Sequence, residues 1–183
     1  NGNRGEVWVY LGNGDGTFGA ATTYSVATAG RSINNIATGD FNGDGKPDLA
    51  LYSQGGYLTI LTNNGGGVFS TTQNSVITGC SGYARSFLVA DFNGDGWPDI
   101  GCENSDYTVG ILLNNGAGGF PSSTTNYPTT ITAGQFGIVA GDFNGDGKQD
   151  IVAVNSSNNT VKVLLGNGNG SLGTASVYPA ANA

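Results

Sequence analysis

The feature that most constrains the fold of this chain is a nine-residue acidic segment that occurs three times. It reads DFNGDGKPD at residues 40–48, DFNGDGWPD at 91–99 and DFNGDGKQD at 142–150, so the copies are 51 residues apart. Repeats of about 50 residues that contain several short strands are typical of propeller blades, whereas solenoid repeats are usually shorter. The interval therefore predicts a series of similar small β-sheets.

Each repeat contains four segments that have the composition of β-strands. Short apolar runs stand before and after each acidic segment, and such runs are typical of strands buried on two faces. A third segment alternates, with Leu58 and Ile60 as examples, and a fourth is more polar. Gly-rich blocks such as 62–69 separate the third from the fourth and supply the positive-φ residues that tight hairpins need. We therefore expect an all-β chain of four-stranded antiparallel sheets.

The arrangement of these segments predicts about three and a half β-propeller blades over residues 1–183. Residues 1–27 hold only a third and a fourth strand, and whole units follow at 28–78, 79–129 and 130–183. Closed propellers typically have about four to eight blades. We therefore expect a partial propeller, either as part of a longer repeat protein or completed by other chains that join its open edges.

The distribution of charge excludes several classes of partner. Nine of the 13 acidic residues lie in the three acidic segments, and the net charge is -7. Nucleic acids and anionic membranes select basic surfaces, so neither is an expected partner. No apolar run approaches the length of about 18 residues that a transmembrane helix requires. The acidic residues are concentrated locally, which indicates a local purpose.

The acidic segments, called here the first, second and third loops, have the pattern of a calcium site. Side-chain oxygens stand at positions 1, 3, 5 and 9, position 7 can offer its carbonyl, and glycines at positions 4 and 6 let the chain curl. Hard oxygen donors without His or Cys suit Ca²⁺ rather than zinc or copper. The predicted ligands of three ions are Asp40, Asn42, Asp44, the Lys46 carbonyl and Asp48; Asp91, Asn93, Asp95, the Trp97 carbonyl and Asp99; and Asp142, Asn144, Asp146, the Lys148 carbonyl and Asp150.

Two other interpretations of the loops compete with this one. An EF-hand needs a Glu at position 12 and flanking helices, but position 12 is Leu51, Cys102 or Ala153 and the flanks read as strands. Simple turns also favour Asp, Asn and Gly. Three carboxylates in each loop would repel one another, and three divalent ions would reduce the formal charge from -7 to -1. The calcium interpretation is therefore preferred.

The loops and their flanking strands resemble the FG-GAP/VCBS repeats of bacterial surface proteins, and are similar to the calcium-binding blades of integrin α-subunit propellers. The resemblance covers essentially the whole chain and implies a β-propeller, Ca²⁺ in the hairpin between the first two strands of each blade, and a secreted or cell-surface location. The Phe-Gly pair occurs only at Phe136-Gly137, where the other repeats have Arg85-Ser86 and Asn34-Asn35.

The expected function is binding or adhesion towards a glycan or protein ligand, since exposed loops on a rigid scaffold commonly carry binding residues. Trp97 replaces a lysine of the other loops. Its side chain is expected to point outward and to bind a sugar or partner, the alternative being that it packs on the adjoining blade. A structural, self-assembling segment is a second candidate function.

Catalysis within this chain is not expected. A catalytic or accessory propeller of a carbohydrate-active enzyme is a further alternative, but the chain has no His, which excludes Ser-His and Cys-His nucleophiles. Outside the loops only Glu103 and Asp106 stand close together, and Glu103 is as easily a surface acid. Cys80 and Cys102 form either one disulfide or two buried thiols.

Overall fold

The computed structural model describes residues 5–26, 31–77, 80, 86–121, 125–128 and 137–180, and within these ranges the regular structure is all β. The strands form a two-stranded N-terminal pair followed by three four-stranded antiparallel sheets, each a meander of consecutive strands. The N-terminal pair is β1 (Gly5–Val9) and β2 (Thr22–Val26). The first sheet is β3 (Ile33–Gly39), β4 (Asp48–Ser53), β5 (Tyr57–Asn63) and β6 (Phe69–Val76).

The other two sheets repeat this topology. The second sheet is β7 (Phe87–Ala90), β8 (Asp99–Glu103), β9 (Thr108–Leu112) and β10 (Thr125–Pro128). The third sheet is β11 (Ile138–Gly141), β12 (Asp150–Asn155), β13 (Thr160–Leu164) and β14 (Ser176–Pro179). The predicted all-β architecture of four-stranded antiparallel sheets is confirmed. Within the described residues no helix is long and apolar enough to cross a membrane.

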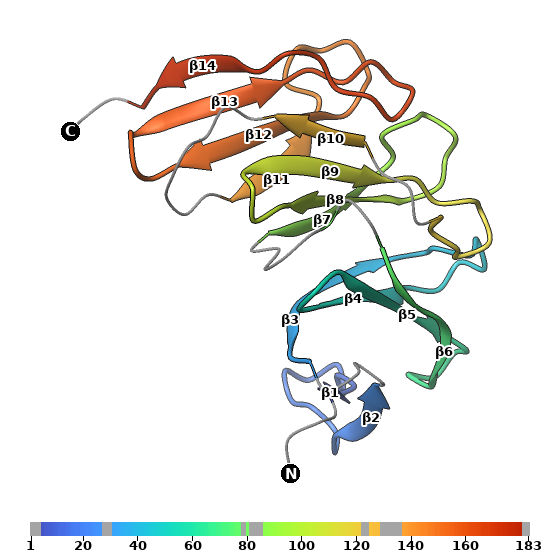
Figure 1. The fold of residues 1–183 in the computed structure, drawn as a ribbon. Coiled ribbons are helices and arrows are strands. Elements are labelled where there is room, and N and C mark those ends of the chain that lie inside the picture. The colour runs from blue at the N-terminus through green and yellow to red at the C-terminus, as the bar shows by residue number, and fades with distance from the viewer. Residues whose placement is uncertain are drawn as a thin grey trace.

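The sheets follow one another in an arc, with the N-terminal pair at one end and the third sheet at the other (Figure 1). Three apolar clusters fill the spaces between successive sheets. Between the N-terminal pair and the first sheet lie Val7, Val26, Leu49, Leu51 and Leu61. The next two spaces hold clusters that include Phe41, Tyr52, Leu58, Ile60 and Ile100, and then Phe92, Ile111, Ile138, Ile151 and Leu164.

The third strands are more deeply buried than their alternating pattern indicates. In β5, Leu58 and Ile60 are fully buried as predicted, but Thr59 and Leu61 on the opposite face are 0% and 2% exposed. Both faces are covered because each inner sheet lies between two neighbours. Tertiary packing thus adds a second buried face that the alternation alone does not show.

The phenylalanine at loop position 2 shows where the array of sheets stops. Phe41 and Phe92 are 0% and 2% exposed because each packs into the space between its own sheet and the next one. Phe143 has the same position in the third loop but is 53% exposed. The outer face of the third sheet therefore has no neighbour among the described residues.

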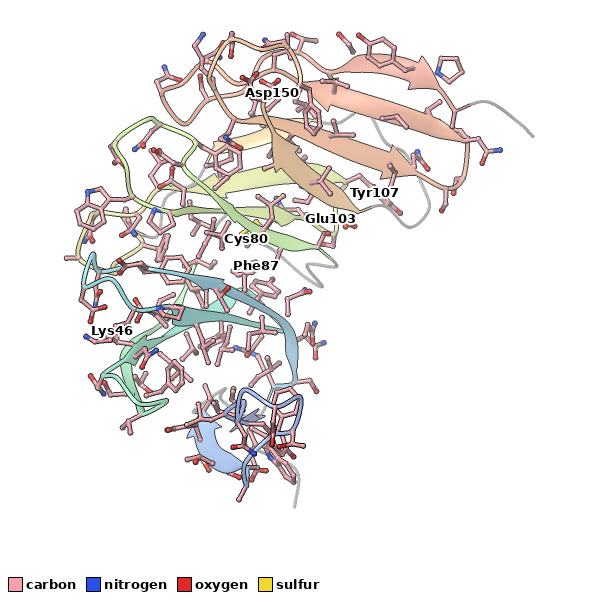
Figure 2. The ribbon with its side chains drawn as sticks, turned by 180° about the vertical axis from the view of Figure 1, so that it is seen from behind. Lys46, Cys80, Phe87, Glu103, Tyr107 and Asp150 are labelled. Carbon is pink, nitrogen blue, oxygen red and sulfur yellow. A yellow bond between two sulfur atoms is a disulfide. The ribbon has the colours of Figure 1, made fainter. Side chains whose placement is uncertain are left out.

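Cys80 and Cys102 form a disulfide, which decides between the two alternatives left by the sequence. Their Cα atoms are 5.8 Å apart, and both residues are fully buried in the cluster between the first and second sheets. Figure 2 shows Cys80 close to Phe87 in this layer. The bond ties the segment that follows the first sheet to β8. Phe136 and Arg85, which concern the Phe-Gly pair, lie outside the described residues.

Candidate metal centre

The three loops occupy equivalent places in the fold, since each joins the first strand of a sheet to the second. The first loop runs from the end of β3 at Gly39 to Asp48, the first residue of β4. The second and third loops lead into Asp99 of β8 and Asp150 of β12. The glycines at positions 4 and 6 all have positive φ values, and Gly43 and Gly45 are at 75° and 78°. These angles let the chain curl as predicted.

Backbone amides of the first loop point at its own side-chain oxygens. Asp40 accepts hydrogen bonds from the amides of Gly43 and Gly45 at 2.8 Å and of Asp44 at 3.1 Å. Asn42 Oδ1 accepts from the Asp44 amide at 3.0 Å, and Asp44 Oδ1 accepts from the Lys46 amide at 2.9 Å. The side chains at positions 1, 3 and 5 therefore organise the curl of the loop.

The second and third loops repeat this pattern. Asp91 accepts from the amides of Gly94 and Gly96 at 2.8 and 2.9 Å. Asp142 accepts from the amides of Gly145 and Gly147 at 2.7 and 2.9 Å. Because the same bonds recur at the same positions, the repeated sequence specifies a repeated local conformation.

The aspartate at position 9 is buried in every loop. Asp48, Asp99 and Asp150 are all 0% exposed. Asp99 accepts hydrogen bonds from the amide of Phe92 at 2.9 Å and from the amide of Asn114 at 2.8 Å. Asp48 and Asp150 have corresponding amide partners. Each carboxylate thus links its own loop to the end of the third strand of the same sheet.

No cation neutralises these buried carboxylates within the described part of the chain. The two ion pairs found there, Lys46 Nζ with Asp44 at 2.9 Å and Lys148 Nζ with Asp146 at 3.3 Å, both involve the exposed aspartate at position 5. Hydrogen bonds from the Lys46 side chain lower the pKa of Asp44, and a hydrogen bond from the Lys148 amide lowers the pKa of Asp146.

The second loop has no such lysine, because position 7 is Trp97. Burial raises the pKa of Asp99 to about 6 against the opposing effect of its two amide hydrogen bonds, and the nearby charges of Asp95 and Asp91 raise it further. Asp95 and Asp91 therefore lie close enough to Asp99 to disfavour its ionised form. Asp95 Oδ2 instead accepts a hydrogen bond from Asn93 Nδ2 at 2.8 Å.

The side chain of Trp97 is half-buried, so the expectation that it points outward is wrong. A Cβ atom at Gly43 would lie 2.5 Å from Cη2 of the indole, and one at Gly116 would lie 2.9 Å from its Nε1. The ring thus covers one glycine of the first loop and one in the hairpin between β9 and β10. This is the packing alternative, and it accounts for Trp97 without a ligand; a role in sugar binding stays a prediction.

The donor set of the loops fits a calcium ion. A carboxylate has about four acceptor positions, and Asp40, Asp44 and Asp48 use three, two and two of them on the amides and the lysine described above. Each keeps acceptor capacity for a hard cation. Among the described residues no three acidic side chains are yet gathered as a finished metal cage. An ion would therefore have to draw the carboxylates of positions 1 and 5 closer to position 9.

Asn114 contributes to this region and is absent from the predicted site. It is 4% exposed, and its Nδ2 donates to the Phe41 carbonyl of the first loop at 2.9 Å and to the Pro98 carbonyl at 3.2 Å. The repeats give only a partial signal for this residue. Asn63 stands at the matching position of the first repeat, but Gly166 stands there in the third. Its partner in the first loop is 73 residues away in the sequence.

Two acidic residues outside the loops, Asp15 and Glu103, differ in their surroundings. Asp15 Oδ1 accepts hydrogen bonds from the amide and hydroxyl of Thr17, and Asn169 accepts the same bonds from Ser171. The block around Asp15 is therefore a turn. Glu103 is only 2% exposed, so its interpretation as a surface acid is wrong. Figure 2 shows it near the end of its strand.

Comparison with known proteins agrees with the repeated β-sheet fold. A model described as FG-GAP-like repeat matches residues 1–51, 40–102, 101–153 and 142–183, which together span the chain. A comparison with curated proteins gave no match. The matched repeats form β-propeller blades, so the three sheets are blades and the arc is part of a propeller. The chain belongs to the FG-GAP-like repeat family.

Proposed function

We propose that this chain is an extracellular binding module whose blades are held by calcium at the three loops. The observation that carries the proposal is the set of buried position-9 carboxylates, all 0% exposed and without an ion pair in the described residues. A buried charge is costly unless an opposite charge pairs with it in addition to its hydrogen bonds. In the second loop two further carboxylates add repulsion. A divalent cation would offset both effects.

Bound calcium would supply a positive charge that attracts carboxylates from both ends of each loop. Asp40, Asn42, Asp44 and Asp48 would hold the ion in the first loop, and their counterparts would do so in the other two. Within the chain, the position-9 carboxylate already connects the loop to the third strand, so fixing it would stiffen the start of the second strand. The ion would therefore act as a structural element of each blade rather than as a catalyst.

Thermal unfolding with calcium and after its removal tests this proposal. Because a ligand that binds only the folded state adds RT ln(1 + [L]/Kd), calcium at about 100 times Kd should add about 2.7 kcal/mol per site. Asp44→Ala, Asp95→Ala and Asp146→Ala should each remove part of the effect. Thr17→Ala, in the turn around Asp15, is a matched control that should leave the calcium effect unchanged. An identical melting temperature with and without calcium would refute the proposal.

Two further observations support the proposed extracellular location. The buried disulfide between Cys80 and Cys102 is of the kind that forms in oxidising compartments. FG-GAP repeats are typical of extracellular or surface proteins. We propose that the exposed loops bind a glycan or protein and that this chain carries no catalysis. A glycan array would test the glycan class, with Trp97→Ala compared against the unmodified chain.

Self-association is a second candidate function, favoured by the uncovered face of the third sheet. Strand register places Val139 opposite Val152, and Val161 opposite both Val154 and Tyr178. Val139, Val154 and Tyr178 are 56%, 48% and 53% exposed. The residues of the first sheet that match Val152, Val154 and Val161 are Ala50, Tyr52 and Leu58, which are fully buried against the second sheet. The face therefore has the composition of a contact between blades.

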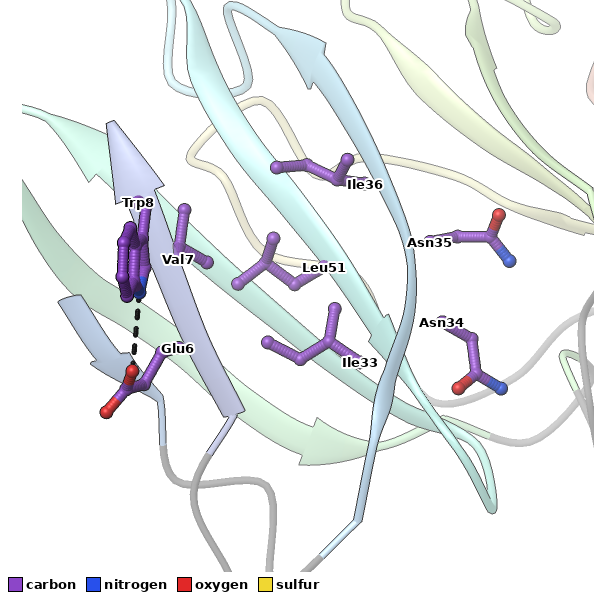
Figure 3. Close-up of a pocket in the computed structure, with 8 residues that line it drawn as sticks. All are labelled: Glu6, Val7, Trp8, Ile33, Asn34, Asn35, Ile36 and Leu51. Carbon is purple, nitrogen blue, oxygen red and sulfur yellow. Dashed lines mark hydrogen bonds between the residues drawn. The ribbon is translucent and has the colours of Figure 1, made fainter. Parts of the chain in front are cut away.

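The junction of the N-terminal pair with the first sheet offers a second candidate contact surface. β1 pairs only with β2 among the described strands, and a groove of about 480 Å³ lies between β1 and β3 (Figure 3). Val7, Ile33, Ile36 and Leu51 line it. Light scattering after size-exclusion chromatography tests association: a monomer at 18.5 kDa over a wide concentration range would refute it, and Val154→Asp should weaken any oligomer.

A further inference from the structure

We propose that the first and second loops bind calcium cooperatively, whereas the third loop binds independently of the second. This inference rests on the proposed calcium-binding function and concerns how contacts between the loops couple their affinities for calcium. Its basis is a pair of side-chain contacts between the two loops, made by Asn114 and Trp97, that is absent at the next junction, where a backbone hydrogen bond connects the sheets.

Asn114 connects the two buried carboxylates through one continuous series of hydrogen bonds. Its backbone amide donates to Asp99 Oδ1 at 2.8 Å, and its side-chain Nδ2 donates to the Phe41 carbonyl at 2.9 Å. The Phe41 amide in turn donates to Asp48 Oδ2 at 3.1 Å. These contacts are buried. Only two residues therefore separate the position-9 ligand of one loop from that of the other.

Trp97 supplies a second contact between the same two loops. Its indole lies against Gly43 at position 4 of the first loop and against Gly116 in the hairpin that follows β9. Its amide donates to Asp95 Oδ1, a predicted ligand of the second loop, at 2.9 Å. A change in the backbone conformation at Gly43 would therefore displace the Trp97 ring, which belongs to the second loop.

The junction between the second and third sheets lacks both features. Gly166 replaces Asn114, and although its amide donates to Asp150 Oδ1 at 2.8 Å, it has no side chain to reach the second loop. The backbone bond from Gly170 to the Phe92 carbonyl at 2.9 Å spans this junction instead. Lys148, at the position of Trp97, pairs with Asp146 of its own loop.

The contact made by Trp97 is also missing at this second junction. The position that matches Gly43 is Gly94, where a Cβ atom would meet only the Gly168 carbonyl within 4 Å among the described residues, at 3.8 Å. At the second junction the residue that bonds to the second loop, Gly170, is four residues away from Gly166, whose amide holds Asp150. At the first junction one residue, Asn114, holds both Asp99 and the Phe41 carbonyl.

An ion that fixes Asp48 would fix the backbone of Phe41, whose amide bonds to Asp48 and whose carbonyl orients Asn114 and with it Asp99. The first ion would then have placed part of the second site before the second ion arrives. Such a pre-organised site binds with less ordering cost, which is positive coupling between the sites. Coupling of this kind is typically at least about fivefold in affinity.

Calorimetric titration of chains with one or two intact loops tests this inference. Asp146→Ala leaves the first and second loops intact, and adding Asp95→Ala or Asp44→Ala leaves one of them. The product of the two affinities in the two-loop chain should exceed the product of the single-loop affinities by at least about fivefold. Asp44→Ala leaves the second and third loops intact and provides the control. In that chain the product of the two affinities should differ from the product of the single-loop affinities by less than about twofold.

Two variants taken from the chain's own third repeat show which residues carry the coupling. Asn114→Gly and Trp97→Lys make the first junction resemble the second, and each should reduce the coupling towards the control value. Circular dichroism would establish that each variant is folded, and Trp97→Lys serves if Asn114→Gly does not fold. Equal coupling at both junctions, or none at the first, overturns the inference while calcium binding stands. No calcium uptake by the unmodified chain refutes the proposed function, and the inference falls with it.

Discussion

The calcium-free protein should become more stable as the pH falls from about 6 to 3.8, contrary to the usual behaviour of a folded acidic protein. The pKa of Asp99 is raised from 3.8 to about 6, first by burial and then by the charges of Asp95 and Asp91. Between these values the folded state holds a proton that the unfolded state has lost. Stability is therefore lost as the pH rises through this window.

The magnitude follows from the size of the rise. Each pH unit of difference between folded and unfolded pKa is worth about 1.4 kcal/mol, so a rise of about 2 units corresponds to about 3 kcal/mol between pH 3.8 and 6. Asp15, Asp44 and Asp146 have lowered pKa values, so their contributions are lost only as the pH falls below 3.8 and lie outside this window. Asp99 should therefore set the sign of the slope.

Denaturant unfolding at a series of pH values, in calcium-depleted buffer and in calcium, measures the effect. Without calcium the free energy of unfolding should fall by about 3 kcal/mol as the pH rises from 3.8 to about 6. Asp99→Asn should flatten this slope. With calcium the slope should weaken or reverse, because a bound cation favours the ionised carboxylate. A calcium-free protein whose stability rises with pH between 3.8 and 6 would refute the reasoning about Asp99.

Three further predictions concern packing. Phe41→Ala should cost about 3–5 kcal/mol in unfolding free energy because it leaves a cavity between two sheets. Phe143→Ala, at the same loop position on the uncovered face, should cost less than about 1 kcal/mol. Equal costs for the two variants would contradict the assignment of that face. Replacing both Cys80 and Cys102 by Ala should cost about 3 kcal/mol in denaturant unfolding, the chain-entropy value for a closed loop of about 22 residues, and an unchanged midpoint would show that the segment after β6 needs no tether. Gly43→Ala should lower the melting temperature by several degrees, because φ is +75° and the new Cβ would meet the Trp97 ring; relief of this loss by Trp97→Lys would identify the ring as the cause.

Sequence alone determined the features that depend on neighbouring residues. The strands, their antiparallel order and the curl of the loops follow from short apolar runs and from Asp, Asn and Gly at fixed positions. The amides of Gly43 and Gly45, for example, bond to Asp40 within the same loop. Such contacts span only a few residues, so they recur wherever the nine-residue pattern recurs. This is also why the predicted ligand positions occupy equivalent places in all three sheets.

Tertiary structure decided everything that depends on which sheet lies next to which. The same residue type stands at position 2 of the first and third loops, yet Phe41 is buried and Phe143 is exposed, because only Phe41 has a neighbouring sheet to pack against. Trp97 lies over Gly43, 54 residues earlier in the sequence, and Asn114 reaches the Phe41 carbonyl across 73 residues. No local pattern encodes these contacts, since a side chain's partners across an interface are set by the face that the neighbouring blade presents.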